Sequence, residues 1–578
     1  IDQWPLPNAR QILEDAGYNV QIVPAQEDLV RDAKPVLFLL WGGVALVLLI
    51  GCVNIANLML ARAQTRVSEM ATKLALGAPR VRVARQVLTE AVVMGLIGGA
   101  LGVGLGALGL KLLLSLGAAD LPRGTEIGIN GAVILFTAAL AVGAGVLFGS
   151  IPMAQVMRGD LNPVFRSEGR GGTSTRGAVV ARNGMVVGQV ALAFVLLIGA
   201  GLMLMSFRSA LSVDPGFNPD KVMTGLVSLP SARYADADAR RQFWDELVTQ
   251  VRALPGVENA SVTAQLPFTG NNSSSVIFPE GYVPAPGESV LSPLTDVVGP
   301  GYLETMGIEL LEGRTFQDSD GPDAQRVIVL DEWLANRYWK DQSPIGARML
   351  YGAVPGMDSI PEDSWYTVIG VVRTIKQNDL TAAASEHFGA YYFSYRQQVP
   401  GSQALVVRTA GDPADITPAL RDVVNRLDPE LPLFGTQTMA SRIDDSLSSR
   451  RIPLILLGVF AVVALFLAVV GIYGALAYSV TQRRREIGIR MAMGSAPGDV
   501  FKNVVGQGVR VMGIGLVVGA AAAWFLAKLV ESLLFGVGAT DPRVLIAVAA
   551  VLGTVGLVAC IIPARRATHV DPVSALGG

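Results

Sequence analysis

Two short basic segments of the sequence share one pattern of charged and small residues. Each carries a glutamate, a basic residue four positions later and a glycine four positions after that. On a helix, residues spaced by four lie on one face, so the acid and the base can pair and the glycine can end the helix. We therefore expect two short helices that offer a charged face to a cytoplasmic partner. With the arginine that precedes each glutamate, the residues are Arg66, Glu69, Lys73 and Gly77 in one segment, and Arg483, Glu486, Arg490 and Gly494 in the other.

For one such segment alone, a solvated basic turn without a partner explains the pattern equally well. The two segments, however, stand in register 417 positions apart, and each lies between two long apolar runs. A repeated pattern of this kind favours a shared role, and docking of a partner is the simplest one.

Residue patterns that support bond chemistry are missing from the sequence. It contains no G-x-x-x-x-G-K-[ST] for a P-loop ATPase, no H-E-x-x-H and no G-x-S-x-G. The two histidines, His387 and His569, and the two cysteines, Cys52 and Cys560, have no metal-ligand spacing. We expect no catalytic, cofactor-binding or metal site and no enzyme activity; serine catalysis with His387 is the alternative that the sequence leaves open.

The charged segments lie between apolar runs that are long enough to cross a membrane. Of 578 residues, 51% are hydrophobic and 16% are charged. A helix needs about 20 apolar residues to span a bilayer. Seven runs come close to or exceed this length. Buried helices of soluble proteins rarely run this long without a charged residue. They cover residues 36–60, 91–110, 132–157, 184–207, 452–480, 511–526 and 544–562.

Basic residues indicate how these spans are oriented. Lys and Arg concentrate after the first, third, fifth and seventh spans, which places those segments in the cytoplasm. The net charge of −2, from 46 basic and 48 acidic residues, predicts no general attraction to nucleic acid. The apolar spans instead predict membrane lipid as a partner. No ionisable residue lies near the centre of a span, which counts against an ion-coupled transporter.

A long polar segment, residues 208–450, lies outside the membrane in this scheme. Alternating and β-branched stretches such as KVMTGLVSL, ENASVTAQL, RVIVL, SWYTVIGVVRTI and ALVVRTA predict strands. Helical periodicity is seen over 237–252, 331–339 and 416–426. We expect an α+β domain here, with two subdomains as an alternative to one.

The whole chain reads as one and a half copies of a repeated unit. SIPMAQVMRGDLNPV at 150–164 resembles IIPARRATHVDPVSAL at 561–576, so both copies end alike. We therefore expect the first copy to lack its opening span and most of its outside domain, and the chain to be a fragment. In lipid, glycines spaced by four permit close helix contact. Helix packing is expected at Gly98, Gly102 and Gly106 and at Gly515 and Gly519.

The run R-x-x-E-[MI]-x-[TI]-[KR]-x-A-x-G resembles the cytoplasmic loop of FtsX-like permeases of ABC transporters. GIYGALAYSVTQRRREIGIRMAMGS, ESLLFGVGATDP and PARRATHVDPVSAL are similar to the end of such permeases. LPGVENASV, GPGYLETMGIELLEGRTF and RVIVLDEWLANRYWKDQSPIGARM resemble a MacB-like periplasmic core domain. The duplication resembles acidobacterial duplicated orphan permeases.

This resemblance implies a multi-pass α-helical membrane protein with about seven transmembrane helices and an α+β extracytoplasmic domain. The expected division is 1–34 (end of a first periplasmic domain), 35–157 (first transmembrane domain, three helices), 158–183 (cytoplasmic linker), 184–207 (transmembrane helix), 208–450 (periplasmic core domain), 451–566 (second transmembrane domain, three helices) and 567–578 (cytoplasmic tail).

The same resemblance implies a permease in the plasma (inner) membrane, whose outside domain moves when a separate ABC ATPase binds and hydrolyses ATP. The coupling role falls on the two charged segments. Efflux of antimicrobial compounds or handling of lipoprotein and envelope substrates is implied, with a periplasmic adaptor as a further partner. The alternative is a regulator of a cell-envelope hydrolase that transports nothing.

Overall fold

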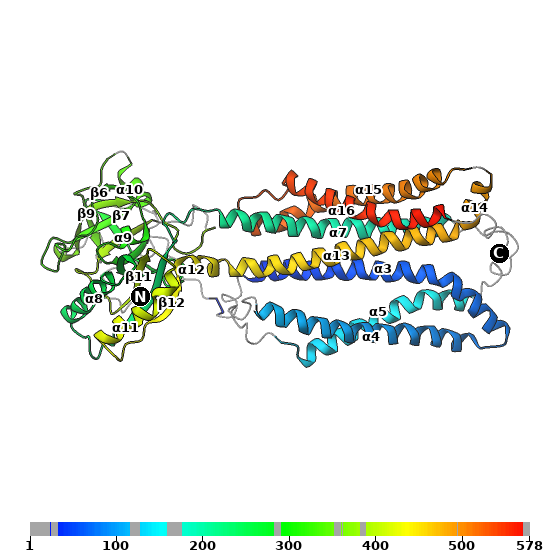
Figure 1. Ribbon diagram of the computed structural model, residues 1–578, viewed down its shortest axis with the longest axis horizontal. Helices are drawn as coiled ribbons and strands as arrows, with labels where there is room; N and C mark the ends of the chain where they lie inside the picture. Colours follow the sequence, from blue (N-terminus) through cyan, green and yellow to red (C-terminus); the bar gives the residue numbers. More distant parts are fainter. Residues whose placement is uncertain are drawn as a thin grey trace. The chain divides into compact units, whose positions relative to one another are not determined.

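The computed structural model describes residues 23–24, 33–115, 128–158, 176–282, 291–340, 342–351, 360, 362–381, 389–493 and 495–569. Contacts divide the chain into two compact units. We call residues 25–209 and 449–578 the helical unit, and residues 210–448 the sheet unit. Figure 1 shows long helices in the first and a twisted sheet with short helices in the second.

Seven helices in the described part of the chain are long and apolar enough to cross a membrane. This confirms the seven spans expected from the sequence. Every helix is longer than its apolar run, because polar residues at the ends continue the backbone hydrogen bonding past the lipid-compatible stretch. The helices are α3 (Ala33–Ala75), α4 (Arg80–Ser115), α5 (Gly131–Arg158), α7 (Arg176–Leu211), α13 (Ser448–Gln482), α15 (Pro497–Val530) and α16 (Pro542–Thr568). The described part of the helical unit also contains the short α14 (Arg484–Ala492) and η6 (Glu531–Leu533).

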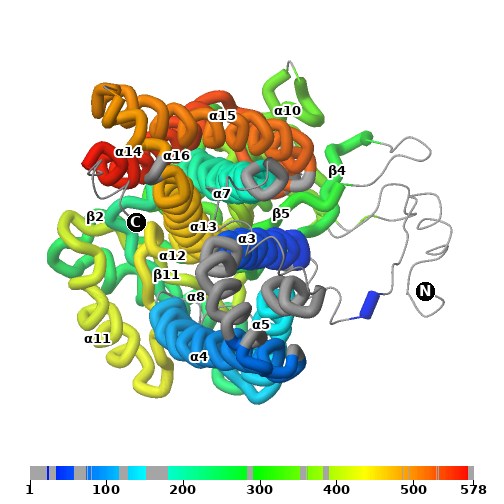
Figure 2. Tube along the Cα trace, turned by 90° about the vertical axis from the view of Figure 1, so that its right-hand side faces the viewer, coloured from blue at the N-terminus to red at the C-terminus, as the bar shows by residue number. Residues whose placement is uncertain are grey.

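The centre of the helical unit is formed by α7, α13 and α3, which lie side by side (Figures 1 and 2). Val190 and Phe194 of α7 are almost fully buried in this core. Two side-chain amides converge on one backbone carbonyl: Asn54 of α3 donates to the carbonyl of Leu467 in α13 at 2.9 Å, and Gln189 of α7 donates to the same oxygen. Amide groups in an apolar interior gain from such bonds, so these two residues connect three helices.

The internal repeat is visible in the positions of the helices. α15 begins 417 residues after α4, and α16 begins 411 residues after α5. The contacts between these helices repeat as well. A Cβ added at Gly149 would lie 3.0 Å from Cβ of Ala91, and one added at Gly508 would lie 2.5 Å from Sγ of Cys560. Since Ala91 corresponds to Gly508 and Gly149 to Cys560, α4 packs on α5 as α15 packs on α16.

The helices that precede the charged segments differ between the copies. In the second copy, α13 ends at Gln482 and α14 begins at Arg484, while in the first copy α3 continues as a single helix. Both end at equivalent residues, Ala75 and Ala492. The expected short helix is therefore a separate element only in the second copy.

The sheet unit is built on one twelve-stranded sheet, in the order β12-β1-β11-β2-β5-β10-β7-β9-β8-β4, with β3 beside β5 and β6 beside β9. Only the β5–β10 and β7–β9 pairs are parallel. The strands are β1 (Val222–Ser228), β2 (Val257–Thr263), β3 (Ser273–Ser274), β4 (Ile277–Pro279), β5 (Leu294–Val298), β6 (Leu310–Gly313), β7 (Val327–Asp331), β8 (Arg348–Tyr351), β9 (Trp365–Val372), β10 (Ala390–Ser394), β11 (Ser402–Thr409) and β12 (Phe434–Thr438).

Helices cover this sheet where the sequence predicts them. α8 (Ala237–Arg252) has the predicted bounds and is capped by Asp236, whose carboxylate accepts from the backbone amide of Ala239. α10 (Glu332–Trp339) begins one residue later than predicted, because Asp331 serves as its N-cap. The others are α9 (Tyr302–Met306), α11 (Thr417–Leu427), α12 (Met439–Ser446), η3 (Glu362–Ser364) and η5 (Pro413–Ile416). The strands join into a single sheet, in which β2 and β5 meet at one residue pair, Thr263 and Val298.

One carboxyl group is buried inside the sheet unit. Asp296 on β5 accepts hydrogen bonds from the backbone of Gln265 at 2.8 Å, from its neighbour Val297 at 2.7 Å and from the hydroxyl of Thr263 at 2.6 Å. Burial raises the pKa of Asp296 to about 7, although these hydrogen bonds oppose the shift. The group thus titrates in the neutral range while linking β5 to β2.

Candidate partner-docking site

The second charged segment forms α14, which follows α13 after a break of one residue. Arg490 donates to Glu486 one turn earlier, with 2.6 Å between Nη2 and Oε1. The side chain of Arg490 is 59% exposed and that of Glu486 is 50% exposed. An exposed pair of this kind stabilises a helix by only about 0.3–0.5 kcal/mol, so the charges remain available to a binding partner.

α14 has one anchored face and one free face. Ile487 is buried and packs with Val500 of α15 and Ala567 of α16. Glu486 and Arg490 are exposed, together with Ile489 and, just past the end of α14, Met493, which leave 40% and 82% of their surface uncovered. Ile487 therefore anchors α14 while these four side chains are presented outward.

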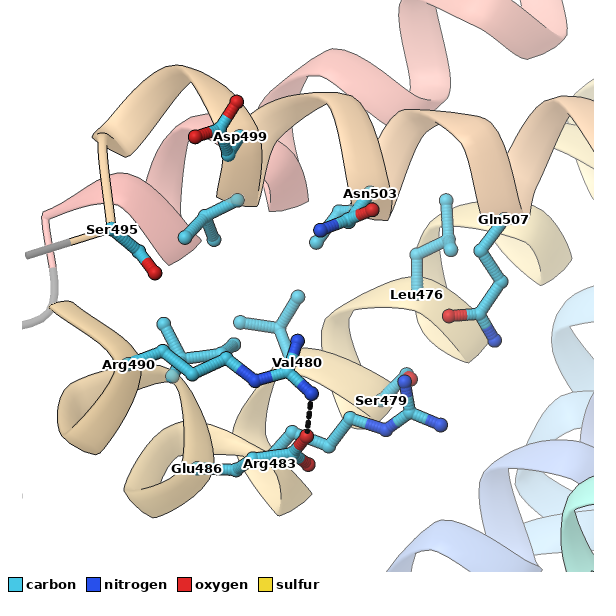
Figure 3. Close-up of a pocket in the computed structure, with 13 residues that line it drawn as sticks. Leu476, Ser479, Val480, Arg483, Glu486, Arg490, Ser495, Asp499, Asn503 and Gln507 are labelled. Carbon is cyan, nitrogen blue, oxygen red and sulfur yellow. Dashed lines mark hydrogen bonds and ion pairs between the residues drawn. The ribbon is translucent and has the colours of Figure 1, made fainter. Parts of the chain in front are cut away.

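A pocket lies between α14, the end of α13 and the start of α15 (Figure 3). In this view Arg490 reaches toward Glu486, while Gln507 of α15 points toward α13. Apolar and polar side chains both line this pocket, a combination suited to an inserted amphipathic side chain. The lining residues are Leu476, Ser479, Val480, Arg483, Glu486, Ile487, Arg490, Ser495, Asp499, Val500, Asn503, Val504 and Gln507.

The first copy ends its long helix with the same backbone geometry. The amide of Ala78 donates to the carbonyl of Lys73 at 3.1 Å, and the equivalent amide of Ser495 donates to Arg490 at 3.0 Å. A hydrogen bond from the amide of residue i+5 to the carbonyl of residue i ends a helix in the Schellman motif. This motif needs a residue in the left-handed conformation directly before the donor. Gly77 supplies this conformation, with φ of +89°.

The next turn repeats too. The amide of Arg82 donates to Pro79 at 2.9 Å, and the amide of Asp499 donates to Ala496 at 3.0 Å. These pairs are again 417 residues apart. The two segments therefore share a helix end, a turn and a helix start, although little of their sequence is identical.

Each helix end also carries a large apolar residue that the sequence patterns did not single out as a pair. Leu76 is 84% exposed and Met493 is 82% exposed. Both directly precede the glycine of their segment and are equivalent in the repeat. The signal that could have revealed them is an apolar residue in the same place of both copies, within loops that are otherwise basic.

Several predicted site residues are only partly described. Arg66 and Glu69 lie within α3, but their side chains are outside the described residues, as is all of Gly494. Lys73 is half-buried at the end of α3, and Arg483 lies between α13 and α14 on the rim of the pocket. Arg66, Glu69 and Lys73 therefore share a helix end with Gly77, and Arg483 joins Glu486 and Arg490 at one pocket.

The predicted packing glycines divide into two groups. Gly515 and Gly519 of α15 lie against α7: an added Cβ would come within 2.7 Å of Val190 Cβ in the first case and within 3.1 Å of Ala191 Cα in the second. Gly98, Gly102 and Gly106 of α4 face no described atom within 4 Å of such a Cβ. The contact between α4 and α5 uses Gly95 and Gly99 instead, which meet Ala141, because those two glycines lie on the side of α4 that faces α5.

The histidines and cysteines, which are the remaining candidates for a chemical site, form no cluster among the described residues. His387 falls outside the described residues. His569, after the end of α16, contacts the carbonyl of Arg565 at 2.9 Å. Cys52 and Cys560 are free thiols in α3 and α16. Among the described residues, no group of three His, Cys, Asp or Glu side chains could hold a metal ion.

Comparison with protein families matches both kinds of unit. The FtsX-like permease C-terminal family matches residues 41–161 and 458–572, and the MacB-like periplasmic core domain family matches residues 183–426. The two FtsX-like matches begin 417 residues apart and end 411 residues apart, as the helices do. The chain belongs to the FtsX-like and MacB-like permeases. Membership of this family identifies the chain as a multi-pass membrane protein with a large extracytoplasmic domain, as the resemblance predicted.

Known relatives of this permease are larger proteins. The macrolide export ATP-binding/permease protein MacB of Chromobacterium violaceum is 29% identical over 296 residues, which cover 48% of this chain and 42% of the relative. MacB of Agrobacterium fabrum is 23% identical over 415 residues, 68% of this chain and 57% of the relative. The permease thus spans less than half the length of the first of these relatives.

Among solved structures, the periplasmic region of MacB from Actinobacillus actinomycetemcomitans aligns with 41% of the permease and 97% of its own chain, at 16% identity and a TM-score of 0.27. The extracellular domain of YknZ aligns with 38% of the permease and 97% of its own chain, at 17% identity and a TM-score of 0.24.

Proposed function

We propose that this permease works with a separate ABC ATPase subunit, and that it transmits the ATPase's conformational change to its extracytoplasmic domain. The two loops with Leu76 and Met493 are the docking points. The observation that carries this proposal is their duplication: two exposed apolar residues, 84% and 82% accessible, end two helices of the same backbone geometry.

Transmission of force suits the construction of α14 and its surroundings. Ile487 fixes α14 to α15 and α16, so a push on the docking face is passed to two membrane helices. Arg566 of α16 donates to the hydroxyl of Tyr473 in α13 at 3.1 Å, which joins these helices near the same end. A displacement of α14 therefore moves α13, α15 and α16 together rather than bending one loop.

We further propose that the permease acts in the bacterial plasma membrane on substrates of the cell envelope or on exported antimicrobial compounds. Support comes from its relatives, whose names describe macrolide export. A route through the helical unit is not required: motion of the extracytoplasmic domain can act on a substrate that is already outside the cytoplasm.

The test is purification of the tagged permease from its native membrane followed by assay of the preparation for ATP hydrolysis. We expect a P-loop ATPase to co-purify and its activity to be inhibited by vanadate. Recovery of a cell-wall hydrolase with the sheet unit, and of no ATPase, would instead favour the regulatory alternative.

A further inference from the structure

A buried arginine lies near the start of the fourth apolar span. Arg182 of α7 is only 8% exposed, and its Nε is buried without a hydrogen-bond partner among the described residues. A guanidinium carries a permanent positive charge and five N–H donors. Removing such a group from water is costly unless an anion or several hydrogen-bond acceptors compensate it. The position of Arg182 therefore favours binding of an acceptor that carries negative charge.

The contact that the structure gives this cation is an aromatic ring. The guanidinium of Arg182 lies over the ring of Tyr478 in α13, with 4.6 Å between Cζ and the ring centroid. Gln482, one turn later, donates to the Tyr478 hydroxyl at 2.6 Å and so helps to hold the ring in place. A cation–π contact of this kind orients a guanidinium. It fixes the position of Arg182 but leaves the charge without an anion.

A second arginine adds positive charge at the same place. Arg483 directly follows α13 and is exposed, and it lies close enough to Arg182 for its like charge to act on it unfavourably. In Figure 3 the Arg483 side chain extends away from the ion pair of Glu486 and Arg490. Within the described part of the chain, neither Arg182 nor Arg483 forms an ion pair with a carboxylate.

From these contacts we propose that Arg182 and Arg483 bind the phosphate group of an anionic phospholipid. Arg182 lies two residues before the apolar run 184–207 and Arg483 three residues after the run 452–480, which is the level at which lipid headgroups begin. Val180, beside this site in the sequence, leaves 69% of its surface exposed, as suits contact with lipid. Basic sites between membrane helices are suited to phosphate-bearing headgroups.

A phosphate satisfies both guanidiniums at once. Its oxygens accept charge-assisted N–H bonds, and a guanidinium can donate two of them in parallel. The negative charge offsets the repulsion between the two arginines and joins the start of α7 to the end of α13. The position equivalent to Tyr478 in the first copy is Ala61, which has no ring to hold an arginine. We therefore expect one lipid of high affinity for each chain.

The test is native mass spectrometry of the permease in detergent during titration with phosphatidylglycerol, which measures the dissociation constant of the first bound lipid. One variant carries Arg182→Gln. A second carries Arg483→Gln, an exposed position at which the substitution should leave the melting temperature unchanged. The matched control, Arg565→Gln, removes the same charge from an exposed position in the last turn of α16.

We expect the first lipid to bind about tenfold more weakly or worse in Arg182→Gln and about fivefold more weakly in Arg483→Gln, with unchanged affinity in Arg565→Gln. If Arg182→Gln melts well below its parent, Arg483→Gln decides the outcome. Equal lipid affinity in the parent and in Arg483→Gln would overturn the proposal, as would an equal loss in Arg565→Gln. Displacement of the lipid by millimolar inorganic phosphate would also overturn it, by assigning the site to a soluble anion.

Discussion

Leu76 and Met493 stand at the same place in the two copies, each one residue before the glycine position that ends its helix, and each leaves more than four-fifths of its surface exposed. An exposed apolar residue in a basic loop gains nothing from water. Under the proposed function, these two residues at equivalent helix ends are the contacts through which one partner binds both copies.

Replacing both of these residues by serine should weaken binding of the ATPase by about tenfold or more, since apolar anchors dominate interface energies. The melting temperature should stay close to that of the parent, because substitutions at exposed sites change stability by about 0.5 kcal/mol or less. Titration of the purified ATPase onto nanodiscs that contain the permease variant measures the change in binding. As a control, Leu105→Ser removes another exposed apolar side chain (71%) from a membrane helix and should leave ATPase binding unchanged.

Gly77 should tolerate asparagine and not valine. Its φ of +89° lies in the left-handed region, which costs a β-branched residue about 1–2 kcal/mol or more and an asparagine much less. Valine should therefore break the bond from the Ala78 amide to Lys73. Hydrogen exchange over residues 70–82 should become about tenfold faster in Gly77→Val and stay near the original rate in Gly77→Asn. Equal exchange in both variants would show that the helix end does not depend on this conformation.

Two glycines of α15, two residues apart, should respond differently to leucine. Gly515 lies against Val190 of α7, whereas no described atom lies within 4 Å of a Cβ at Gly513. Gly515→Leu must push α7 away or disturb the core, at a cost of about 1–3 kcal/mol. In detergent melts the Gly515→Leu variant should lose several degrees and Gly513→Leu almost none. A similar loss in both variants would contradict the packing of α7 on α15.

Stability of the sheet unit should depend on pH through Asp296. Its pKa is raised from 3.8 to about 7 in the folded protein, so between these values the folded chain holds a proton that the unfolded chain releases. The free energy of unfolding therefore falls as pH rises from about 4 to 7, by about 1 kcal/mol per pH unit, and this contribution levels off above 7.

An Asp296→Asn variant keeps the neutral form at every pH. Its amide can donate to the Thr263 hydroxyl, and its carbonyl can accept from the amides of Gln265 and Val297. The melting temperature of the variant should depend less on pH than that of the parent. The variant should also be more stable than the parent at pH 8. A parent and variant with the same pH profile would show that Asp296 does not titrate in this range.

Much of the fold follows from simple patterns in the sequence. Apolar length predicts the seven spans, and α8 has the predicted bounds because Asp236 caps it where the helical periodicity begins. The repeat at 417 residues predicts that α4 and α15 occupy equivalent places. These are local or repeated features, so no knowledge of distant contacts is needed.

Features that depend on neighbours could not be predicted in the same way. The glycines of α4 form two faces, and only the structure shows that Gly95 and Gly99 contact α5 while Gly98 and Gly102 do not. Asp296 belongs to an ordinary-looking strand, and its burial depends on β2 and β10 beside it. Leu76 lies beyond the last turn of α3, so its exposure depends on tertiary placement.

We propose that both charged loops bind one ATPase, and charge reversal in both copies is the test of this proposal. The variant carries Glu69→Lys and Glu486→Lys. Its matched control carries Lys111→Glu and Lys528→Glu, which are equivalent residues near the C-terminal ends of α4 and α15, far along each helix from the charged loops.

The measurement is the amount of ATPase that co-purifies with each tagged variant from native membranes, relative to the amount of permease. Docking through the loops predicts at least a tenfold loss for the glutamate variant and full recovery for the lysine control. Unchanged recovery of the ATPase with Glu69→Lys plus Glu486→Lys would contradict the account.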